Sequence, residues 1–190
     1  MNPNNEIRFA GFGGQGIIMA GYIVGKAAAI YDNKYSTLIQ SFGPEARGSA
    51  CSAQLLISNE PILYPYITIP NIVVALSRDA YDTYGHQITK GGILLIEKDL
   101  VQIKENTKDI TIYAIPATRL AEEMGRKIVM NIITVGFFAA TTGVTTYEAT
   151  RKAVETSVPA GTEELNLKAF DAGYNYGIEL LKPRKKLVTD

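Results

Sequence analysis

The stretch Ile7-Arg8-Phe9-Ala10-Gly11-Phe12-Gly13-Gly14-Gln15-Gly16-Ile17 decides the fold of this 190-residue chain. Its first four residues, Ile7–Ala10, have the length and mainly apolar character of a short β-strand. The glycines that follow permit a tight turn, and the alanine- and isoleucine-rich residues 17–30 favour a helix. A strand that runs through a glycine turn into a helix is typical of an α/β domain.

Further strands and helices alternate along the rest of the chain. The predicted strands are Tyr35–Gln40, Ala50–Ser58, Ile72–Leu76, Ile93–Glu97 and Ile110–Ala114. The predicted helices are Arg78–Tyr84, Ala117–Met124, Ile128–Thr142, Thr146–Ser157 and Glu163–Leu181. This order predicts one domain over residues 1–190, with three α/β/α layers, a mostly parallel (mixed) sheet and a helical C-terminal part.

The composition excludes several classes of protein. Lys plus Arg equals Asp plus Glu, 19 against 19, so no overall charge draws the chain to nucleic acid or to an anionic membrane. The basic run lies in residues 182–190, which we expect to be a flexible tail. The first residues are polar, and no apolar run is long enough to span a bilayer, so we expect a cytoplasmic chain.

The chain contains one cysteine, Cys51, and one histidine, His86. An iron–sulfur cluster normally needs four cysteine ligands, and a zinc site needs a comparable set of cysteine and histidine. A Ser-His-Asp triad would have to use the single histidine. We therefore expect no catalytic residue, no metal site and no tightly held redox centre in this chain.

Gly11, Gly13 and Gly16 match the G-x-G-x-x-G pattern, whose backbone N–H groups can face an anion at a helix start. A dinucleotide site also uses an acidic residue at the end of the second strand. Asp32 precedes that strand, and Gln40-Ser41 stand at its end. The glycine turn therefore has several open interpretations: NAD, another ligand, a partner protein or close packing.

The glycine turn and the later loop Ser41-Phe42-Gly43-Pro44-Glu45-Ala46-Arg47-Gly48 together resemble the gamma subunit of 2-oxoacid:ferredoxin oxidoreductases. This family covers enzymes for pyruvate, 2-oxoisovalerate and 2-oxoglutarate. Further matching positions are Ala75-Leu76-Ser77, Gly91-Gly92, Ile115-Pro116-Ala117, Asn131, Thr142-Gly143, Asn166, Ala169, Phe170, Gly173 and Tyr174. Ser49 and Asn71 depart from the pattern, which usually has glycine and aspartate there.

The resemblance implies that a 2-oxo acid and coenzyme A are converted to acyl-CoA and CO₂ while ferredoxin is reduced. It also implies that thiamine diphosphate, magnesium and the iron–sulfur clusters belong to the alpha, beta and delta subunits, so that ferredoxin meets the complex and not this chain. The isolated chain is then inactive. Among the 2-oxo acids we favour 2-oxoglutarate.

The resemblance also implies where this chain meets coenzyme A. The candidate residues are Gly11, Gly13, Gly14, Gln15, Gly16, Ser41, Glu45, Arg47 and Asn131. Arg47 suits a phosphate or carboxylate because its guanidinium can bind such a group with two hydrogen bonds. Other roles stay open: Arg47 could pair with Glu45, Gln15 could cap the helix start, and Asn131 could hold a neighbouring loop.

Two further hypotheses compete with this interpretation. The chain could be an autonomous NAD-binding domain of the Rossmann type, or a module that only binds other subunits. A subunit with an exposed partner surface can also self-associate, so a homodimer of the isolated chain is expected as well.

Overall fold

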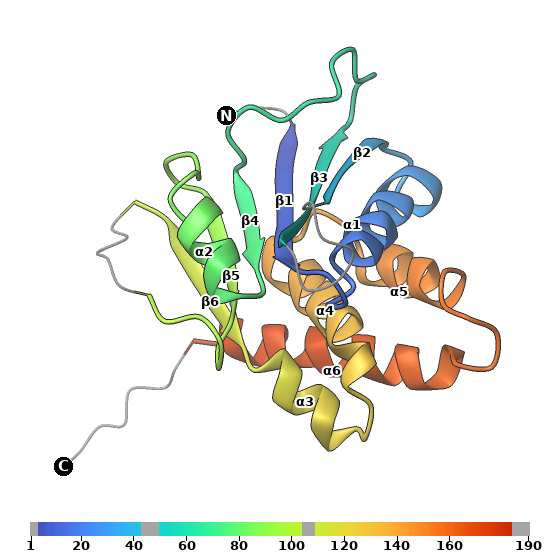
Figure 1. Ribbon diagram of the computed structural model, residues 1–190. Coiled ribbons are helices and arrows are strands. Elements are labelled where there is room, and N and C mark those ends of the chain that lie inside the picture. The colour runs from blue at the N-terminus through green and yellow to red at the C-terminus, as the bar shows by residue number, and fades with distance from the viewer. Residues whose placement is uncertain (1–3, 43–49, 104–108, 184–190) are drawn as a thin grey trace.

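The computed structural model describes residues 4–42, 50–103 and 109–183, drawn as ribbon in Figure 1. Its strands are β1 (Asn5–Phe12), β2 (Tyr35–Phe42), β3 (Ala50–Ser58), β4 (Ile72–Ala75), β5 (Ile93–Glu97) and β6 (Thr111–Ile115). Its helices are α1 (Ile17–Lys26), α2 (Arg78–Tyr84), α3 (Ala117–Glu123), α4 (Met130–Thr142), α5 (Tyr147–Glu155) and α6 (Glu163–Leu181). A π-helical turn, Ala27–Tyr31, follows α1, and a 3-10 turn, Lys127–Val129, precedes α4.

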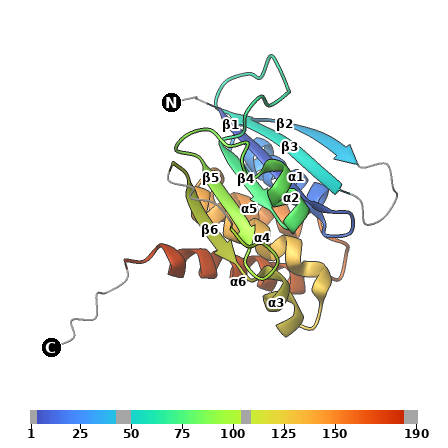
Figure 2. The same ribbon diagram turned by 60° about the vertical axis from the view of Figure 1, so that its left-hand side comes forward.

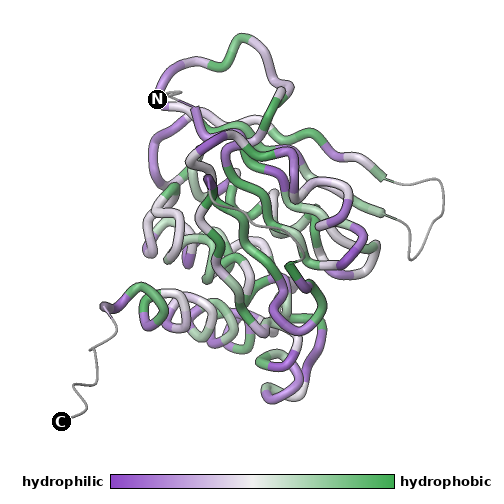
Figure 3. Tube along the Cα trace, turned by 90° about the vertical axis from the view of Figure 1, so that its left-hand side faces the viewer, coloured by the Kyte–Doolittle hydropathy of each residue, from purple (hydrophilic) through white to green (hydrophobic). Residues whose placement is uncertain are grey.

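The strands form one sheet in the order β2-β3-β1-β4-β5-β6. The pairs β1/β4, β4/β5 and β5/β6 are parallel, whereas β3 is antiparallel to both β1 and β2. The central strands are apolar along most of their length, as expected for strands that are covered on both faces (Figure 3). The prediction of a mostly parallel, mixed sheet is confirmed.

Helices lie on both faces of the sheet, but they are divided unequally between them. One face carries α1, α4 and α5, with α6 packed against α4, and this side holds the larger core, in which Phe9 contacts Phe138 at 5.4 Å between ring centroids. Of the described helices, only α2 covers the other face, over the smaller cluster around Val73, Tyr81 and Leu94 (Figure 2). The expected three layers are therefore present, with most of the buried apolar area on one side.

The helices α4 and α6 approach each other more closely than side chains would allow. A Cβ added to Gly136 would lie 2.1 Å from the carbonyl oxygen of Phe170, and one added to Gly173 would lie 1.9 Å from that of Ile133. Glycine is therefore required at both positions for the two backbones to pack directly. This contact fixes the middle of α6 against the middle of α4.

The observed elements differ from the predicted ones mainly at their ends. The helix predicted over 17–30 is α-helical only to Lys26, and its last turn is π-helical, with the amide of Asp32 donating to the carbonyl of Ala27. β1 and β2 are longer than predicted because both pair along their full length with β3. The expected flexible tail falls mostly on residues 184–190, which lie outside the described residues.

Candidate functional site

The glycine turn lies at the carboxyl edge of the sheet, defined here as the edge where β1, β4 and β5 end (Figure 1). The amide of Gln15 donates to the carbonyl of Phe12 at 3.1 Å, and the amide of Phe12 donates to Gln15 Oε1 at 2.7 Å. Gly14 and Gly16 have φ angles of 98° and 73°. These left-handed conformations favour glycine, so the sequence pattern and the turn geometry agree.

Gln15 also connects the turn to the neighbouring strand. Its Nε2 donates to the carbonyl oxygen of Leu76, directly after β4, at 3.0 Å. A Cβ at Gly11 would lie 2.4 Å from Gln15 Oε1, so the absence of a side chain at position 11 makes room for this amide. Gln15 therefore braces the turn against β4, which is a positioning role.

Asn131 braces the same turn from the first residues of α4. Its Nδ2 donates to the carbonyl oxygen of Gly16 at 3.4 Å, and only 7% of the residue is exposed. A Cβ at Gly16 would lie 2.4 Å from that nitrogen. Two amide side chains, from the turn itself and from a helix 115 residues later, thus hold the glycine backbone in place.

The turn stands at a switch point of the sheet. β1 and β4 are parallel neighbours, yet α1 leaves β1 toward one face and α2 leaves β4 toward the other (Figure 2). In open α/β sheets the crevice between two such connections is where ligands bind. The position of the glycine turn therefore supports a ligand site beyond what the glycine pattern alone could predict.

Two pockets flank the turn and share Gly14. The large pocket has a volume of about 460 Å³ and is lined by Gly14, Gly16, Met19, Arg126, Ile128, Val129, Asn131, Ile132, Ser157, Val158, Pro159, Thr162, Leu165 and Asn166. The small pocket, about 240 Å³, is lined by Gly14, Gln15, Leu100, Thr118, Lys127, Ile128 and Met130. A Cβ at Gly14 would meet no atom within 4 Å, so the backbone there is open to an approaching ligand.

The two cations beside these pockets differ in their surroundings. Lys127 Nζ lies 2.8 Å from Glu122 Oε1, and this hydrogen-bonded pair raises the pKa of Lys127. The side chain of Arg126, by contrast, forms no ion pair or hydrogen bond with any residue in the described ranges. Arg126 is thus the cation that is free to meet an anion at the large pocket. Arg126 is not among the residues predicted from the sequence, because a lone arginine after Gly125 has no distinguishing pattern.

Glu97 is a buried acidic residue at the end of β5, and it too is not among the residues predicted from the sequence. Its carboxylate accepts hydrogen bonds from the amide of Asp99 at 3.1 Å and from the amide and hydroxyl of Thr118 at 3.0 and 3.3 Å. Burial raises its pKa, and these hydrogen bonds act in the opposite direction. Glu97 ties β5 to the start of α3. In the sequence, Glu97 could have been recognised because it is an acidic residue at the end of the otherwise apolar run Ile93–Glu97.

The remaining candidates are placed as follows. Gly13 lies inside the turn, and Ser41 lies exposed near the end of β2, opposite Ser52. Glu45 and Arg47 lie outside the described residues. The described positions that flank them, Phe42 and Ala50, are at the carboxyl edge, where Ala50 pairs with Phe12. Asp32 binds Thr146, the N-cap residue of α5, and does not approach the turn, since its carboxylate accepts from the amide and hydroxyl of Thr146 at 2.8 and 2.6 Å.

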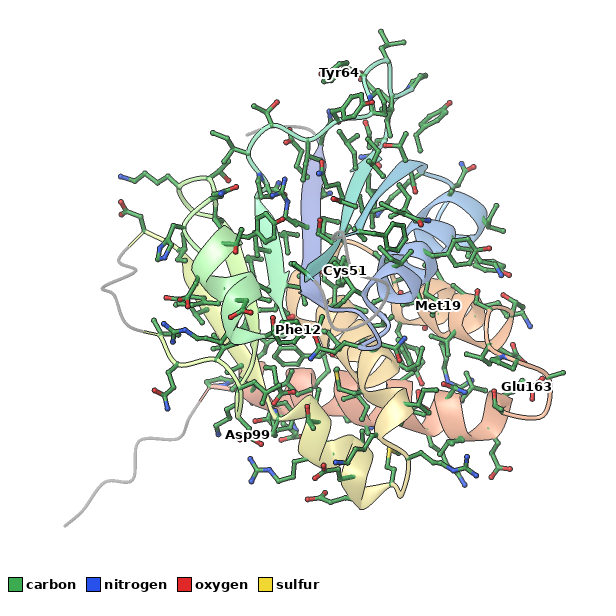
Figure 4. All side chains as sticks on the ribbon, viewed as in Figure 1. Phe12, Met19, Cys51, Tyr64, Asp99 and Glu163 are labelled. Atoms are coloured by element: carbon green, nitrogen blue, oxygen red, sulfur yellow. The ribbon has the colours of Figure 1, made fainter. Side chains whose placement is uncertain are left out.

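The described ranges contain neither a cluster of metal-binding side chains nor a helix that could span a membrane. No three His, Cys, Asp or Glu side chains gather there in an arrangement that could bind a metal ion. Cys51 is buried on β3, and burial raises the pKa of its thiol (Figure 4). Within the same ranges, no helix has both the length and the apolar character that crossing a membrane requires.

The fold and the site together define an α/β domain with a braced glycine turn at a switch point. In the described part of β2, Gln40 and Ser41 stand where a dinucleotide site has an acidic residue. The sequence pattern of the pyruvate ferredoxin/flavodoxin oxidoreductase family matches residues 6–176, and the chain belongs to that family. Within it, the chain is a gamma subunit and acts as part of a multi-subunit 2-oxoacid:ferredoxin oxidoreductase.

The relatives support this assignment over almost the whole length. The 2-oxoglutarate synthase subunit KorC of Methanocaldococcus jannaschii is 49% identical over 177 residues, which cover 92% of this chain and 95% of the relative. The pyruvate synthase subunit PorC of Methanothermobacter marburgensis is 35% identical, covering 89% and 95%. A solved gamma subunit of keto/oxoacid ferredoxin oxidoreductase from Geobacter sulfurreducens matches with a TM-score of 0.84 and 40% identity, covering 93% and 97%.

Proposed function

We propose that this chain is the gamma subunit of a 2-oxoglutarate:ferredoxin oxidoreductase. The complex would convert 2-oxoglutarate, coenzyme A and oxidised ferredoxin to succinyl-CoA, CO₂ and reduced ferredoxin. The observation that carries the choice of substrate is the identity of 49% to a 2-oxoglutarate synthase subunit, against 35% to a pyruvate synthase subunit, over similar lengths. The autonomous NAD-binding hypothesis is not favoured, because Asp32 is engaged with Thr146.

The reactive cofactors belong to other subunits in this proposal. Thiamine diphosphate, magnesium and the iron–sulfur clusters would belong to the alpha, beta and delta subunits, and the clusters would pass electrons to ferredoxin. A single buried cysteine does not fit a cluster, which needs four thiolates. Among the described residues, no three His, Cys, Asp or Glu side chains gather in an arrangement that could hold a metal ion. No residue of this chain is therefore assigned a catalytic step.

The role proposed for this chain is to form part of the path of coenzyme A. The backbone at Gly14 is open on its outer side, it borders two pockets, and the turn lies at the switch point of the sheet. Free N–H groups at the start of α1 suit the diphosphate of coenzyme A, because no side chain caps that helix. Arg47, from the segment between Phe42 and Ala50, would add a cation.

Co-purification tests the proposed complex. The tagged chain, expressed with its partner subunits in the native host, should recover subunits that contain thiamine diphosphate and iron–sulfur clusters. The purified complex should reduce ferredoxin faster with 2-oxoglutarate than with pyruvate or 2-oxoisovalerate. Recovery of the chain alone, only as the homodimer expected of an isolated subunit, would contradict the proposal, whereas a preference for pyruvate would correct the substrate only.

Substitution of Arg47 tests the coenzyme A path. In the assembled complex Arg47→Ala should raise the KM for coenzyme A by about tenfold, the effect of one lost charge-assisted contact, and leave the KM for the 2-oxo acid unchanged. Arg119→Ala is the matched control, because Arg119 pairs with Asp99 at 3.0 Å and lines neither pocket. Equal KM values for coenzyme A in both variants would remove Arg47 from the path.

A further inference from the structure

Arg8 is a half-buried cation in the middle of β1, and no acidic side chain among the described residues pairs with it. Val73, opposite Arg8 on β4, belongs to the cluster beneath α2, so Arg8 points to that face of the sheet. Its Nε–H group is buried and has no hydrogen-bond partner within the described ranges. Buried polar atoms are normally paired, so this atom requires an explanation.

The electrostatic surroundings of Arg8 are those of a cation without a counter-charge. Burial lowers the pKa of Arg8, and the interaction with Tyr84 acts in the opposite direction. Arginine nevertheless stays charged at neutral pH, so the folded chain keeps a partly desolvated positive charge. An anion that bonded to the guanidinium would remove this penalty.

The position of the guanidinium is suited to a carboxylate. Its central carbon lies 4.4 Å from the centroid of the Tyr84 ring, which is the distance of a cation–π contact. Such a contact uses the face of the guanidinium and leaves the N–H groups in its plane available. These N–H groups form two parallel hydrogen bonds with a carboxylate when the geometry allows it. Arg8 is therefore a preformed site for an acidic side chain.

Arg8 borders a part of the sheet that we call the open face, defined by the row Arg8, Gln54 and Ile39. Strand register places Gln54 of β3 opposite Arg8 and Ile39 of β2 opposite Gln54. Residues opposite one another in a sheet point to the same side. The helix on this side, α2, packs against β1 and β4, whereas β3 and β2 extend beyond it (Figure 2). Gln54 and Ile39 are both partly exposed.

An apolar loop between β3 and β4 borders the open face at the amino end of β1. The amide of Thr68 in this loop donates to the carboxylate of Glu6 at 3.0 Å, and Glu6 precedes Arg8 by two residues on the same side of the sheet. Large exposed side chains on the loop are Leu63 at 96%, Tyr64 at 66% and Tyr66 at 55% (Figure 4 labels Tyr64). Apolar side chains that are gathered in one exposed region are typical of protein–protein interfaces.

These features favour a protein over a small anion as the occupant. Arg8 lies outside the pockets at both edges of the sheet. A free anion would therefore stay in contact with water and would leave the apolar loop uncovered. A protein surface that carries an acidic residue would cover the loop and balance the charge of Arg8 together.

We propose that the open face docks a partner subunit of the oxidoreductase and that a carboxylate of this subunit pairs with Arg8, an inference that rests on the proposed function. The carboxylate bonds to the in-plane N–H groups while the guanidinium stays stacked on Tyr84. Gln54 offers its amide beside this ion pair, and the apolar loop packs against an apolar surface of the partner. Arg8 is thus a cation whose counter-charge arrives with assembly.

Dissociation of the assembled complex tests the ion pair. The complex is purified through a tag on a partner subunit and diluted, and mass photometry follows the loss of this chain. Arg8→Met should weaken its association by about tenfold or more, because a charge-assisted contact is lost. Arg8→Lys, which keeps the charge, should recover part of the affinity.

Arg78→Met is the matched control for this measurement. Arg78 lies on α2, and its guanidinium also lies over a tyrosine ring, at 5.5 Å from Tyr81. In contrast to Arg8, it is paired, since its Nη2 lies 2.8 Å from Asp82 Oδ1. Arg78→Met should therefore dissociate as the wild type does. Equal dissociation constants for Arg8→Met and the wild type would overturn the proposal.

The stability of the isolated full chain provides a readout that a merely structural role would move in the other direction. Arg8→Met removes a desolvated cation and keeps an unbranched side chain that can contact Tyr84. Its urea midpoint should be equal to or higher than that of the wild type, although its assembly is weaker. A lower midpoint together with normal assembly would assign Arg8 to the fold of the chain alone.

Photo-crosslinking identifies the occupant of the open face without a change at Arg8. Ile39→p-benzoylphenylalanine places the crosslinker in the row that contains Arg8, and the purified complex is irradiated and analysed by mass spectrometry. The crosslinked peptide should belong to a partner subunit and should contain Asp or Glu close to the crosslink. A crosslink to a second copy of this chain, or to the chain itself, would contradict the proposal.

The outcomes separate this inference from the proposed function. If Arg8→Met assembles normally or the crosslink joins two copies of this chain, the docking site is wrong, and a complex that reduces ferredoxin with 2-oxoglutarate still stands. In complexes that stay assembled, Arg8→Met should leave the KM for coenzyme A unchanged. If the wild-type chain recovers no partner subunits, the proposed function fails, and the docking site fails with it.

Discussion

The β1–α1 turn and the α4–α6 crossing both depend on glycine, but for different physical reasons. In the turn, Gly14 and Gly16 adopt left-handed backbone conformations, and the space beside Gly14 is open. In the crossing, Gly136 and Gly173 have ordinary helical conformations, and backbone atoms of the other helix fill the space where a Cβ would be. At Gly14 the lack of a side chain leaves the backbone accessible. At Gly136 and Gly173 it allows the backbones of two helices to pack directly.

The difference teaches that a glycine pattern alone does not identify a ligand site. The glycines of the turn and Gly173 of the crossing were visible in the sequence as positions shared with a family, whereas Gly136 was not singled out. Only the environment distinguishes them: side chains and open space surround the turn, whereas the crossing is lined by backbone atoms that cannot rotate away. Substitutions to alanine should therefore affect stability at the crossing and ligand binding at the turn.

The largest effect is expected at the crossing. In Gly173→Ala the new Cβ would lie 1.9 Å from the carbonyl oxygen of Ile133, and α4 and α6 would have to separate. We expect a loss of at least about 3 kcal/mol in the free energy of unfolding, measured by urea denaturation followed by circular dichroism. Asn175→Ala, an exposed change on the same helix, should stay within about 0.5 kcal/mol. Similar midpoints for both variants would show that the two helices are not closely packed.

A smaller loss is expected at the braced glycine of the turn. Gly16→Ala combines a strained backbone, φ 73°, with a Cβ 2.4 Å from Nδ2 of Asn131, and should cost about 2 kcal/mol. Because a side chain is the obstacle, the cost of Gly16→Ala should fall when Asn131 is also replaced by alanine. A double-mutant cycle of unfolding free energies measures this coupling. Strictly additive effects would mean that Asn131 does not brace the turn.

Glu97, at the carboxyl edge of the sheet, should make the free energy of unfolding depend on pH. Burial raises its pKa, so the folded chain binds a proton more tightly than the unfolded chain does. Its contribution to stability should therefore decrease as pH rises from the unfolded-state pKa of about 4.3 through the higher folded-state pKa. Glu97→Gln should remove this slope and cost about 1–2 kcal/mol at neutral pH, because an amide NH₂ would face a backbone donor. Urea midpoints of the wild type and of Glu97→Gln, measured across this pH range, test this prediction. If the pH dependence of stability persists in the variant, it belongs to another titrating group.

The smallest effect on stability is expected at Gly14, where a side chain meets no neighbour but the φ angle is 98°. Gly14→Ala should cost about 1 kcal/mol in unfolding free energy. In the assembled complex it should nevertheless raise the KM for coenzyme A by about tenfold, since the new methyl group occupies the open side of the turn. An unchanged KM would place coenzyme A away from this turn. The turn glycines would then differ from the crossing glycines in geometry only, and not in a role in ligand binding.

Much of the fold could be predicted from local sequence patterns, whereas the candidate site could be predicted only in part. The strands Ala50–Ser58 and Ile93–Glu97 and the helix Glu163–Leu181 were predicted with their observed bounds, because apolar runs and helical periodicity act within a few turns. The turn that contains Gly14 was predicted as well. Arg126 was not selected, because its place in the large pocket depends on residues of α1, α4 and α6. Glu97 was not selected, because its hydrogen bonds to Thr118 join residues that are 21 positions apart. Arg47 and Glu45 remain predictions.

The sequence by itself determined a glycine turn between a strand and a helix, a chain with too few cysteines for a cluster, and a family resemblance. These properties depend on residue type and on neighbours along the chain. Only the tertiary structure decided that β1 lies between β3 and β4, that Gln15 reaches Leu76, and that Asn131 and Asn166 line one pocket. Sheet order and helix crossing are set by packing between distant segments, which no local pattern specifies.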